Sequence, residues 1–347
     1  MYWLGDAPSW DMPSLGKRIA SLTQAVRKFF GEDQEPFRVF WRRAAKGYGG
    51  AGGFRSFMLE YTPGPNSTVT EELSPSALEN LISHESVHGY ALMSPVRQED
   101  VWYREGAAVY YAVVAPFLAG VVDRGYLTHW LNNAAQSYYT GGTTRLDWKY
   151  VMENYWSGTQ LVRTSYCRGF IYLAQVQGLV SEATNGTKGV DDLVRRLYQR
   201  YKSNYPVQSE HFIAALADYI GQTAAETSFE GMKYGKNLVI PSADSLRRFG
   251  LKMIRNDSEE LELGFSEESL GRGVVSRLVP GSRAEQAGLH EGDVIVRSWG
   301  LSTAADAFEN NLKVVVQRDG KQMDIVYWPR SHAKVECYQW VSIGSSE

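Results

Sequence analysis

Apolar residues recur with two different spacings in the first 61 residues of the chain. In residues 15–30 they recur every three or four positions, which predicts an amphipathic helix. Its apolar face consists of Leu15, Ile19, Leu22, Val26 and Phe29. Aromatic and β-branched residues dominate 37–42 and 54–61, a composition typical of strands. Residues 47–53, between the two strands, are mostly glycine, so the sequence predicts a loop that is flexible or closely approached by another segment.

Helical patterns follow a polar stretch that is rich in turn residues. Residues 75–88 carry an apolar stripe, and Ser76 with Glu79 three positions later has the spacing of a capping box. A second helix is predicted at 100–119, and residues 126–221 are predicted to be mostly helical.

Short strand patterns separated by turn residues characterise the chain beyond residue 245. The helical pattern ends between residues 232 and 245, which indicates a boundary there. The strands expected after it are 273–276, 293–296, 312–317 and 323–328. The sequence therefore predicts an α+β protein with two domains, a mixed domain at 1–245 and a small β-rich domain at 246–347.

Composition and charge narrow the classes of function. The 347 residues are 44% hydrophobic and 22% charged, as in a soluble globular protein, and the net charge of −3 gives no support for a nucleic-acid or anionic-membrane partner. No apolar run is long enough to span a membrane, and residues 1–6 do not resemble a signal peptide, so a cytoplasmic location is expected. Cys167 and Cys337 are far apart and form no disulfide framework or zinc motif.

The predicted helix at 75–88 carries the first candidate chemistry. His84 and His88 are four residues apart, so on a helix both side chains lie on one face with Cβ atoms about 5–6 Å apart, and the two imidazoles can bind one metal ion. Glu85 lies beside them and can take a proton from water, the role expected of the glutamate in His-Glu-x-x-His zinc sites. The alternative is a core helix with two ordinary histidines.

A third protein ligand is needed to hold a catalytic zinc ion and leave one position open. Glu105 is the candidate, because it lies on the next predicted helix among apolar and aromatic neighbours. A buried carboxylate without a partner is costly, and a cation removes that cost. The alternative is an exposed helix glutamate.

These residues resemble the glycyl aminopeptidase family of gluzincin metallopeptidases. The resemblance is carried by three motifs: His84-Glu85-x-x-His88, Trp102-x-x-Glu105-Gly106-x-x-x-Tyr110-Tyr111 and Tyr166-Cys167-Arg168-Gly169. It implies a thermolysin-like catalytic domain with a mostly helical C-terminal lobe. It also implies that Tyr166 donates a hydrogen bond to the oxyanion of the tetrahedral intermediate.

The C-terminal part resembles the PDZ domain that this family carries. The similar segment runs from Val275 through Pro280-Gly281 and Ala287-Gly288-Leu289 to Ile295. By this resemblance Leu263, Gly264 and Phe265 form the loop that captures a peptide C-terminus.

The sequence departs from the family in two places. The family has a large β domain before the catalytic domain, and almost nothing precedes residue 15 here, so a more open site is expected. The family also has a glutamate that holds the substrate amino group, and the matching segment here includes Gly50, Ala51 and Gly52, with Gly52 at the glutamate position. The three residues are candidate substrate-binding positions without that anchor.

The favoured function is hydrolysis of amide bonds in peptides or a peptide-like metabolite, by a zinc enzyme that is not a strict aminopeptidase. His84, His88 and Glu105 are the expected zinc ligands, and Glu85 and Tyr166 the expected catalytic residues. The alternative is a PDZ-type peptide-binding scaffold with vestigial catalysis. The complete set of three ligands and Glu85 favours the enzyme, because a scaffold needs none of them.

Overall fold

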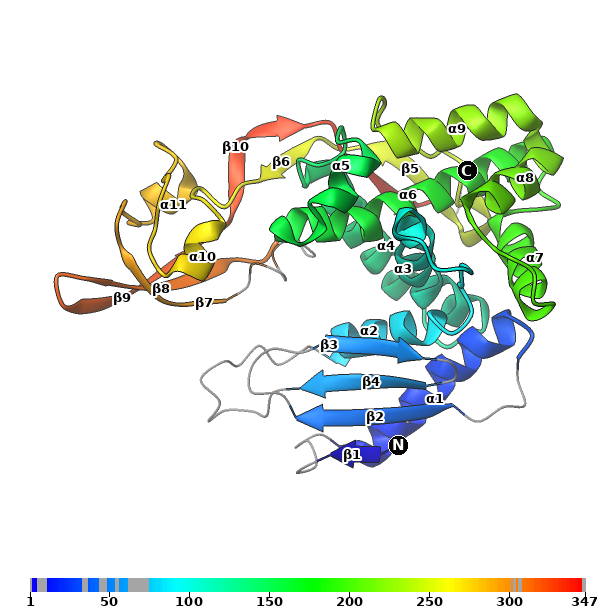
Figure 1. Cartoon of the computed structure of the whole chain (residues 1–347), viewed down its shortest axis with the longest axis horizontal. Coiled ribbons are helices and arrows are strands. Elements are labelled where there is room, and N and C mark those ends of the chain that lie inside the picture. The colour runs from blue at the N-terminus through cyan, green and yellow to red at the C-terminus, as the bar shows by residue number, and fades with distance from the viewer. Residues whose placement is uncertain are drawn as a thin grey trace.

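A computed structural model of the chain describes residues 2–4, 11–32, 37–43, 49–53, 56–61, 75–299, 301, 304 and 308–344. It combines helices and sheets in three parts: an N-terminal sheet layer, a helical layer and a β-rich unit (Figure 1). The helices are α1 (Met12–Phe29), α2 (Pro75–Val87), α3 (Val101–Leu118), α4 (Arg124–Thr140), α5 (Trp148–Glu153), α6 (Thr159–Ala183), α7 (Val190–Lys202), α8 (Ser209–Ile220), α9 (Gln222–Tyr234), α10 (Glu268–Arg272) and α11 (Arg283–Gln286). The strands are β1 (Tyr2–Leu4), β2 (Arg38–Arg43), β3 (Gly49–Gly53), β4 (Ser56–Tyr61), β5 (Leu251–Arg255), β6 (Ser258–Leu261), β7 (Val294–Trp299), β8 (Leu312–Arg318), β9 (Lys321–Tyr327), β10 (Arg330–Val335) and β11 (Tyr338–Ser342).

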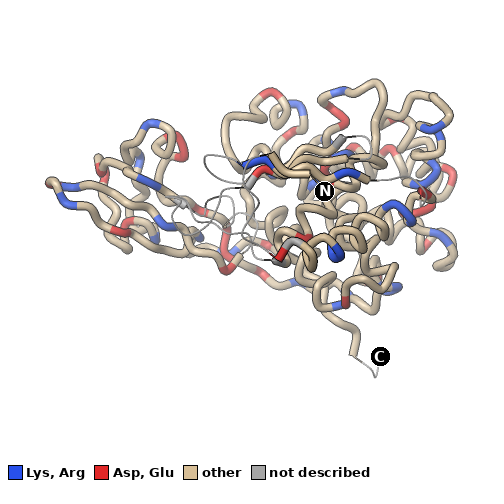
Figure 2. The backbone as a smooth tube through the Cα atoms, turned by 90° about the horizontal axis from the view of Figure 1, so that it is seen from below, with Lys and Arg blue, Asp and Glu red and all other residues tan. Residues whose placement is uncertain are grey.

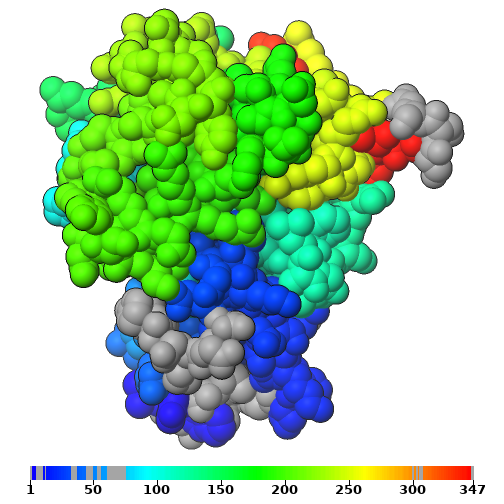
Figure 3. Space-filling model, turned by 90° about the vertical axis from the view of Figure 1, so that its right-hand side faces the viewer, coloured from blue at the N-terminus to red at the C-terminus, as the bar shows by residue number. Residues whose placement is uncertain are grey.

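The N-terminal sheet has the strand order β1-β2-β4-β3. The first three of these strands are parallel, and β3 pairs antiparallel with β4 along the edge. Helices α1 and α2 share one hydrophobic core with this sheet. That core consists of Ile19, Val39, Trp41, Phe57, Leu59, Leu78 and Ile82. In Figure 3 this part, in blue, forms the lower lobe beneath the helical part in green.

The predicted elements of this region are partly confirmed. The helix at 15–30 and the strand at 37–42 are present as α1 and β2, and the second strand is present from Ser56, with residues 54 and 55 outside the described residues. The loop prediction is wrong for 49–53, which forms β3. The rest of that predicted loop, residues 47 and 48, lies outside the described residues.

The capping box at Ser76 and Glu79 is also wrong, because α2 begins at Pro75 and both residues lie within the helix. Glu79 instead forms an ion pair with Arg18 on α1 at 2.9 Å, and the Ser76 hydroxyl accepts a hydrogen bond from the Trp130 indole.

The helical layer is built around the crossing of α3 and α6. Its large core includes most of α3, the buried face of α6 and the apolar stripes of α7 and α8, so the predicted helices at 100–119 and across much of 126–221 are confirmed. Two glycines allow the crossing. A Cβ atom on Gly106 would lie 2.5 Å from the Cα atom of Gly169, and one on Gly169 would overlap the carbonyl oxygen of Trp102. The two backbones therefore touch, and no other residue type fits at either position.

The β-rich unit has a separate, smaller core. Strands β7, β8 and β9 form an antiparallel meander, which confirms the strands expected at 293–296, 312–317 and 323–328. The strand expected at 273–276 is wrong, because Gly273 and Arg277 have positive φ angles and leave only a single bridge, from Val274 to Val294. The core residues are Phe265, Val275, Ala284, Leu289, Leu312, Val314, Val316, Ile325 and Tyr327.

Two strand pairs connect this unit to the helical layer. β6 pairs with β10, and β5 pairs with β11, both antiparallel. The sequence did not predict these four strands. Leu251, Met253, Cys337 and Trp340 from β5, β11 and the residue before β11 belong to the core of the helical layer rather than to that of the β-rich unit. The division of the chain at residue 245 stays a prediction, and the packing assigns the segments at both ends of 246–347 to the helical core.

Charges of both signs are spread along the described parts of the chain. Among the described helices, none combines the length and the apolar character that crossing a bilayer requires. Lys and Arg residues alternate with Asp and Glu along the tube in Figure 2.

The α3–α6 crossing makes a prediction about stability. Gly169→Ala should lower the free energy of unfolding by about 3 kcal/mol or more, because the added methyl group forces two packed helices apart. Gly231→Ala is the matched control, since Gly231 lies on α9 with no atom within 4 Å of the position of its Cβ. This control should be neutral or stabilising by up to about 1 kcal/mol. Urea denaturation of both variants measures the difference, and similar midpoints would contradict the close crossing.

Candidate metal centre

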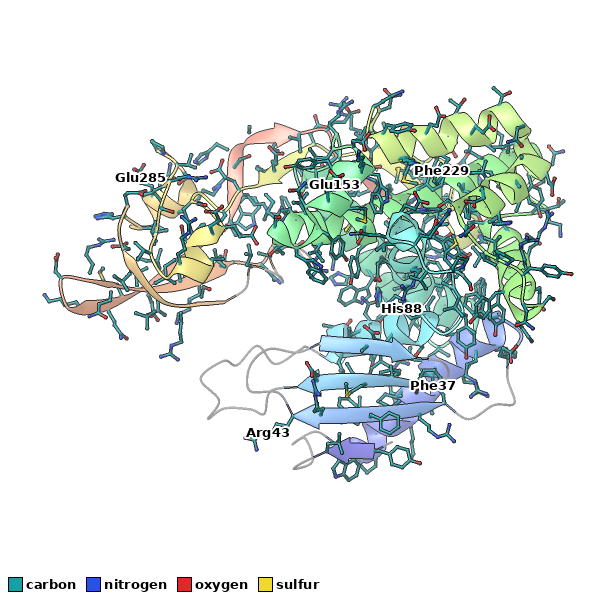
Figure 4. The ribbon with its side chains drawn as sticks, in the orientation of Figure 1. Phe37, Arg43, His88, Glu153, Phe229 and Glu285 are labelled. Atoms are coloured by element: carbon teal, nitrogen blue, oxygen red, sulfur yellow. The ribbon has the colours of Figure 1, made fainter. Side chains whose placement is uncertain are left out.

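Helix α2 carries His84 and Glu85 to the junction of the sheet layer and the helical layer, and His88 follows directly after its last residue. Leu78 and Ile82 on α2 pack in the core of the sheet, whereas Val87 packs in the core of the helical layer. The last turn of the helix therefore lies between the two parts, and Figure 4 labels His88 at this junction, above β3. The histidines lie at the junction because the first part of α2 packs in the core of the sheet and its last residue packs in the core of the helical layer.

Helix α3 brings Glu105 to the two histidines. The Oε2 atom of Glu105 lies 3.5 Å from Nε2 of His84 and 3.5 Å from Nε2 of His88, and the three ligand atoms all lie within 4.8 Å of one another. Ligand atoms at tetrahedral zinc, with bonds of about 2.0–2.1 Å, are about 3.3–3.4 Å apart. The distances to Glu105 match that edge length.

The surroundings of these atoms also fit a cation. The side chains of His84, His88 and Glu105 are 12%, 11% and 14% exposed, so they are largely shielded but accessible. Within the described residues the buried Oε2 atom of Glu105 has no hydrogen-bond partner. A buried carboxylate oxygen without a donor, facing two imidazole nitrogens, is the arrangement that a divalent cation completes.

The protonation states favour metal binding. Burial, with the charge of His84 adding to it, lowers the pKa of His88 to about 4, so its imidazole is neutral at neutral pH. Burial opposes ionisation of Glu105, but the neighbouring imidazoles of His84 and His88 outweigh it and lower the pKa of Glu105. Neutral imidazoles and an ionised carboxylate are the forms that ligate zinc.

Glu85 lies beside the ligands but does not join them. Its side chain is buried, and burial raises the pKa of its carboxyl group, with the charge of Glu105 acting in the same direction. The backbone of Gly52 donates a hydrogen bond to the carboxylate. Glu85 is therefore held between α2 and the edge strand β3, next to the ligand set.

Tyr166 reaches the same place from α6. Its ring stacks on the His84 ring with centroids 5.7 Å apart and an angle of 10° between the planes. Burial, and next the negative charge of Glu105, raise the pKa of Tyr166 well above its usual value, so the phenol keeps its proton. The α3–α6 crossing sets this position, because Gly106 follows Glu105 directly and Gly169 lies three residues after Tyr166.

The glycines of β3 lie against Glu85 and His88. A Cβ atom on Gly50 would lie 2.6 Å from Oε1 of Glu85, and one on Gly52 would lie 2.7 Å from Cβ of His88. Ala51 is exposed and points to the opposite face, as expected of alternate strand residues. The assignment of Gly52 to the position of an amine-binding glutamate stays a prediction. The structure gives a steric reason for glycine at position 52, because any side chain there would displace His88.

The residues predicted to form a peptide-binding loop lie in the β-rich unit, apart from His84, His88 and Glu105. The carbonyl of Leu263 accepts a hydrogen bond from the Tyr327 hydroxyl, the carbonyl of Gly264 accepts one from the Val279 backbone, and Phe265 is buried in the unit's core. The segment that follows forms α10 rather than a strand. Near α10, Glu267 accepts hydrogen bonds from the backbone and hydroxyl of Thr159, at the start of α6, at 2.8 and 2.5 Å.

Three residues near the candidate ligands were not predicted from the sequence: Tyr155, Arg163 and Arg104. The Tyr155 hydroxyl lies 3.4 Å from the Ser165 hydroxyl, and the positive charges of Arg163 and Arg104 act on Tyr155. The sequence signal for Arg104 was its place between Tyr103 and Glu105, where a cation interrupts a helix that is otherwise apolar and aromatic.

Comparisons with known proteins show the fold. No protein-family model matches the sequence, and no curated protein matches it. Among solved structures, the chain is similar to an aminopeptidase N family protein from Idiomarina loihiensis, with a TM-score of 0.62, 14% identity and coverage of 99% of this chain. An M1 zinc metallopeptidase from Deinococcus radiodurans matches with a TM-score of 0.43 and 14% identity over 69% of this chain and 49% of that chain. The chain spans 66% of the length of the Idiomarina protein and shares its mixed helical and sheet fold.

Proposed function

We propose that the chain is a zinc-dependent metallohydrolase that cleaves amide bonds in peptides or in a peptide-like metabolite. The observation that carries the proposal is the equal spacing of the Glu105 carboxylate from the His84 and His88 imidazoles, with Glu85 beside them. The shared fold with an aminopeptidase N family protein supports the same class of reaction. His84, His88 and Glu105 would hold zinc, which supplies Lewis acidity that polarises a carbonyl group and makes water more acidic.

Glu85 carries the proton in the proposed reaction. Its carboxylate accepts the proton of the attacking water and later delivers it to the leaving nitrogen, which completes hydrolysis of the amide bond. The hydrogen bond from Gly52 orients the carboxylate, and the adjacent β3 backbone and the burial of Glu85 limit access of other water molecules.

Tyr166 stabilises the negative charge that develops on the carbonyl oxygen. Its phenol stays protonated and is held in place by the His84 ring, so it can donate a hydrogen bond when the oxyanion forms.

We also propose that the β-rich unit is PDZ-like and binds a peptide C-terminus near Leu263, Gly264 and Phe265. Its antiparallel strands, its own core and the left-handed Gly264 support this assignment. The segment after Phe265 forms the short helix α10 rather than a strand, so binding beside it requires a docking geometry other than addition of a strand to that segment.

Metal content tests the proposed centre. Wild-type protein should bind about one zinc ion per chain, and His84→Ala or Glu105→Ala should lose it, because each removes one of three ligands. Glu85→Gln should keep the zinc and lose about 10²-fold or more of its activity, since an amide cannot accept the proton. Metal analysis with a peptide-cleavage assay separates the two roles. Folded wild-type protein that stays zinc-free after reconstitution would rule out this ligand set.

Tyr166→Phe should lower kcat by about 10²–10³ and leave KM nearly unchanged, because the lost hydroxyl acts on the transition state rather than on the bound substrate. Steady-state kinetics on one good peptide substrate measures both constants. A near-normal kcat would show that another donor serves the oxyanion.

We further propose that the chain does not require a free amino terminus. Gly52 offers no carboxylate for an ammonium group, and the charge of Arg104 acts on His88 and Glu105. N-acetylated peptides should therefore be hydrolysed at least as well as their free counterparts, which a matched pair of peptides tests. A preference of about a hundredfold for the free amine would mean that another residue holds it.

A further inference from the structure

Arg104 places a positive charge beside the candidate metal centre that the proposed reaction does not use. It precedes Glu105 on α3 and is partly buried. Within the described part of the chain no hydrogen bond or ion pair of its guanidinium is found, whereas the nearby buried Arg168 donates to the carbonyls of Thr143 and Leu146. A partly buried guanidinium loses some of its hydration, so it favours an anionic partner.

Arg163 adds a second positive charge from α6. Its guanidinium carbon lies 6.0 Å from the ring centroid of Tyr166, the same ring that stacks on His84. The charges of Arg163 and Arg104 both act on Tyr155, whose hydroxyl is near Ser165. The two arginines therefore reach a common region from two helices, beside the residues assigned to catalysis.

The balance of charge at the centre is positive once a divalent cation is bound. Glu85 and Glu105 contribute two negative charges, Arg104 contributes one positive charge, and a divalent ion adds two more. In a shielded site this net charge attracts an anion and repels an ammonium group. An arginine also binds a carboxylate through two parallel hydrogen bonds, which gives direction as well as attraction.

We propose that Arg104 forms an anion-binding subsite that selects substrates with a carboxylate next to the scissile amide. The proposal rests on the proposed amide hydrolase and specifies its substrate class. The carboxylate can come from an acidic side chain on either side of the scissile bond or from a free C-terminus one residue beyond it. Arg104 is a specificity residue in this scheme and takes no part in proton transfer.

The test uses N-acetylated peptides that differ at one position. Glu, Gln and Lys are compared on each side of the scissile bond, and a free C-terminus is compared with its amide, so the two sources of the carboxylate are measured separately. For zinc-loaded wild-type protein, kcat/KM should be about tenfold or more higher for one of the carboxylate peptides than for its neutral match. Arg104→Gln should reduce that ratio to about twofold or less with zinc content unchanged, and Arg104→Lys should keep part of it.

Arg272→Gln is the matched control, because it removes one positive charge from α10, where Arg272 pairs with Glu268. It should leave the ratio unchanged. A wild-type ratio near one for every pair, or a ratio that survives in Arg104→Gln, would overturn the subsite. Loss of zinc in Arg104→Gln without loss of selectivity would also overturn it and assign Arg104 to support of Glu105.

A binding measurement separates this proposal from the proposed function. Fluorescence anisotropy of the same labelled peptides with the zinc-loaded Glu85→Gln chain needs no turnover. Tighter binding of the carboxylate peptide that is lost on adding Arg104→Gln supports the subsite even if wild-type protein cleaves nothing, in which case the hydrolase proposal fails alone. Cleavage by the wild type with equal binding of carboxylate and neutral peptides sinks the subsite alone.

Discussion

The backbone contact between α3 and α6 is the constraint on which the candidate centre depends. Gly106 and Gly169 have no side chains, so the two helices approach until their backbones touch. Glu105 and Tyr166 project from the same crossing, and their relative position is therefore set by backbone packing rather than by flexible side chains. A site built on such rigid elements keeps its geometry without a bound ligand to organise it.

Two other contacts hold the crossing in place. Arg168, fully buried next to Gly169, donates hydrogen bonds to the carbonyls of Thr143 and Leu146 and fixes the segment between α4 and α5 against α6. At the N-terminus of α6, Glu267 accepts hydrogen bonds from Thr159, and the helix dipole favours a carboxylate at that end. Tyr166 lies between these two attachments, so α6 is restrained on both sides of it.

The sequence predicted most of the helical layer, because helices depend on local spacing. It also named His84, His88 and Glu105, which the structure brings together, and their binding of a metal stays a prediction. Helical periodicity placed α1, α3 and α8, and the four-residue spacing of His84 and His88 required only a helix. Glu105 was predicted from the cost of burying a carboxylate. What the sequence did not predict depends on contacts between distant segments. Glycines carry no side-chain pattern, so β3 was predicted as a loop. The ion pair of Glu79 with Arg18 joins residues 61 positions apart, so no local motif predicts it.

The pairing of β5 with β11 has a consequence for how the chain can be divided. Arg255, the last residue of β5, lies opposite Tyr338, the first residue of β11. The chain therefore leaves the helical layer and returns to it at the same end of this strand pair. In topological terms the residues between these strands are an insertion into a hairpin, and the helical core with Trp340 is complete only when the final strand has returned. The β-rich unit can therefore vary in length or content, or be replaced by a tight turn, without interrupting the connectivity of the helical core, whereas cutting the chain once before β5 would remove part of that core.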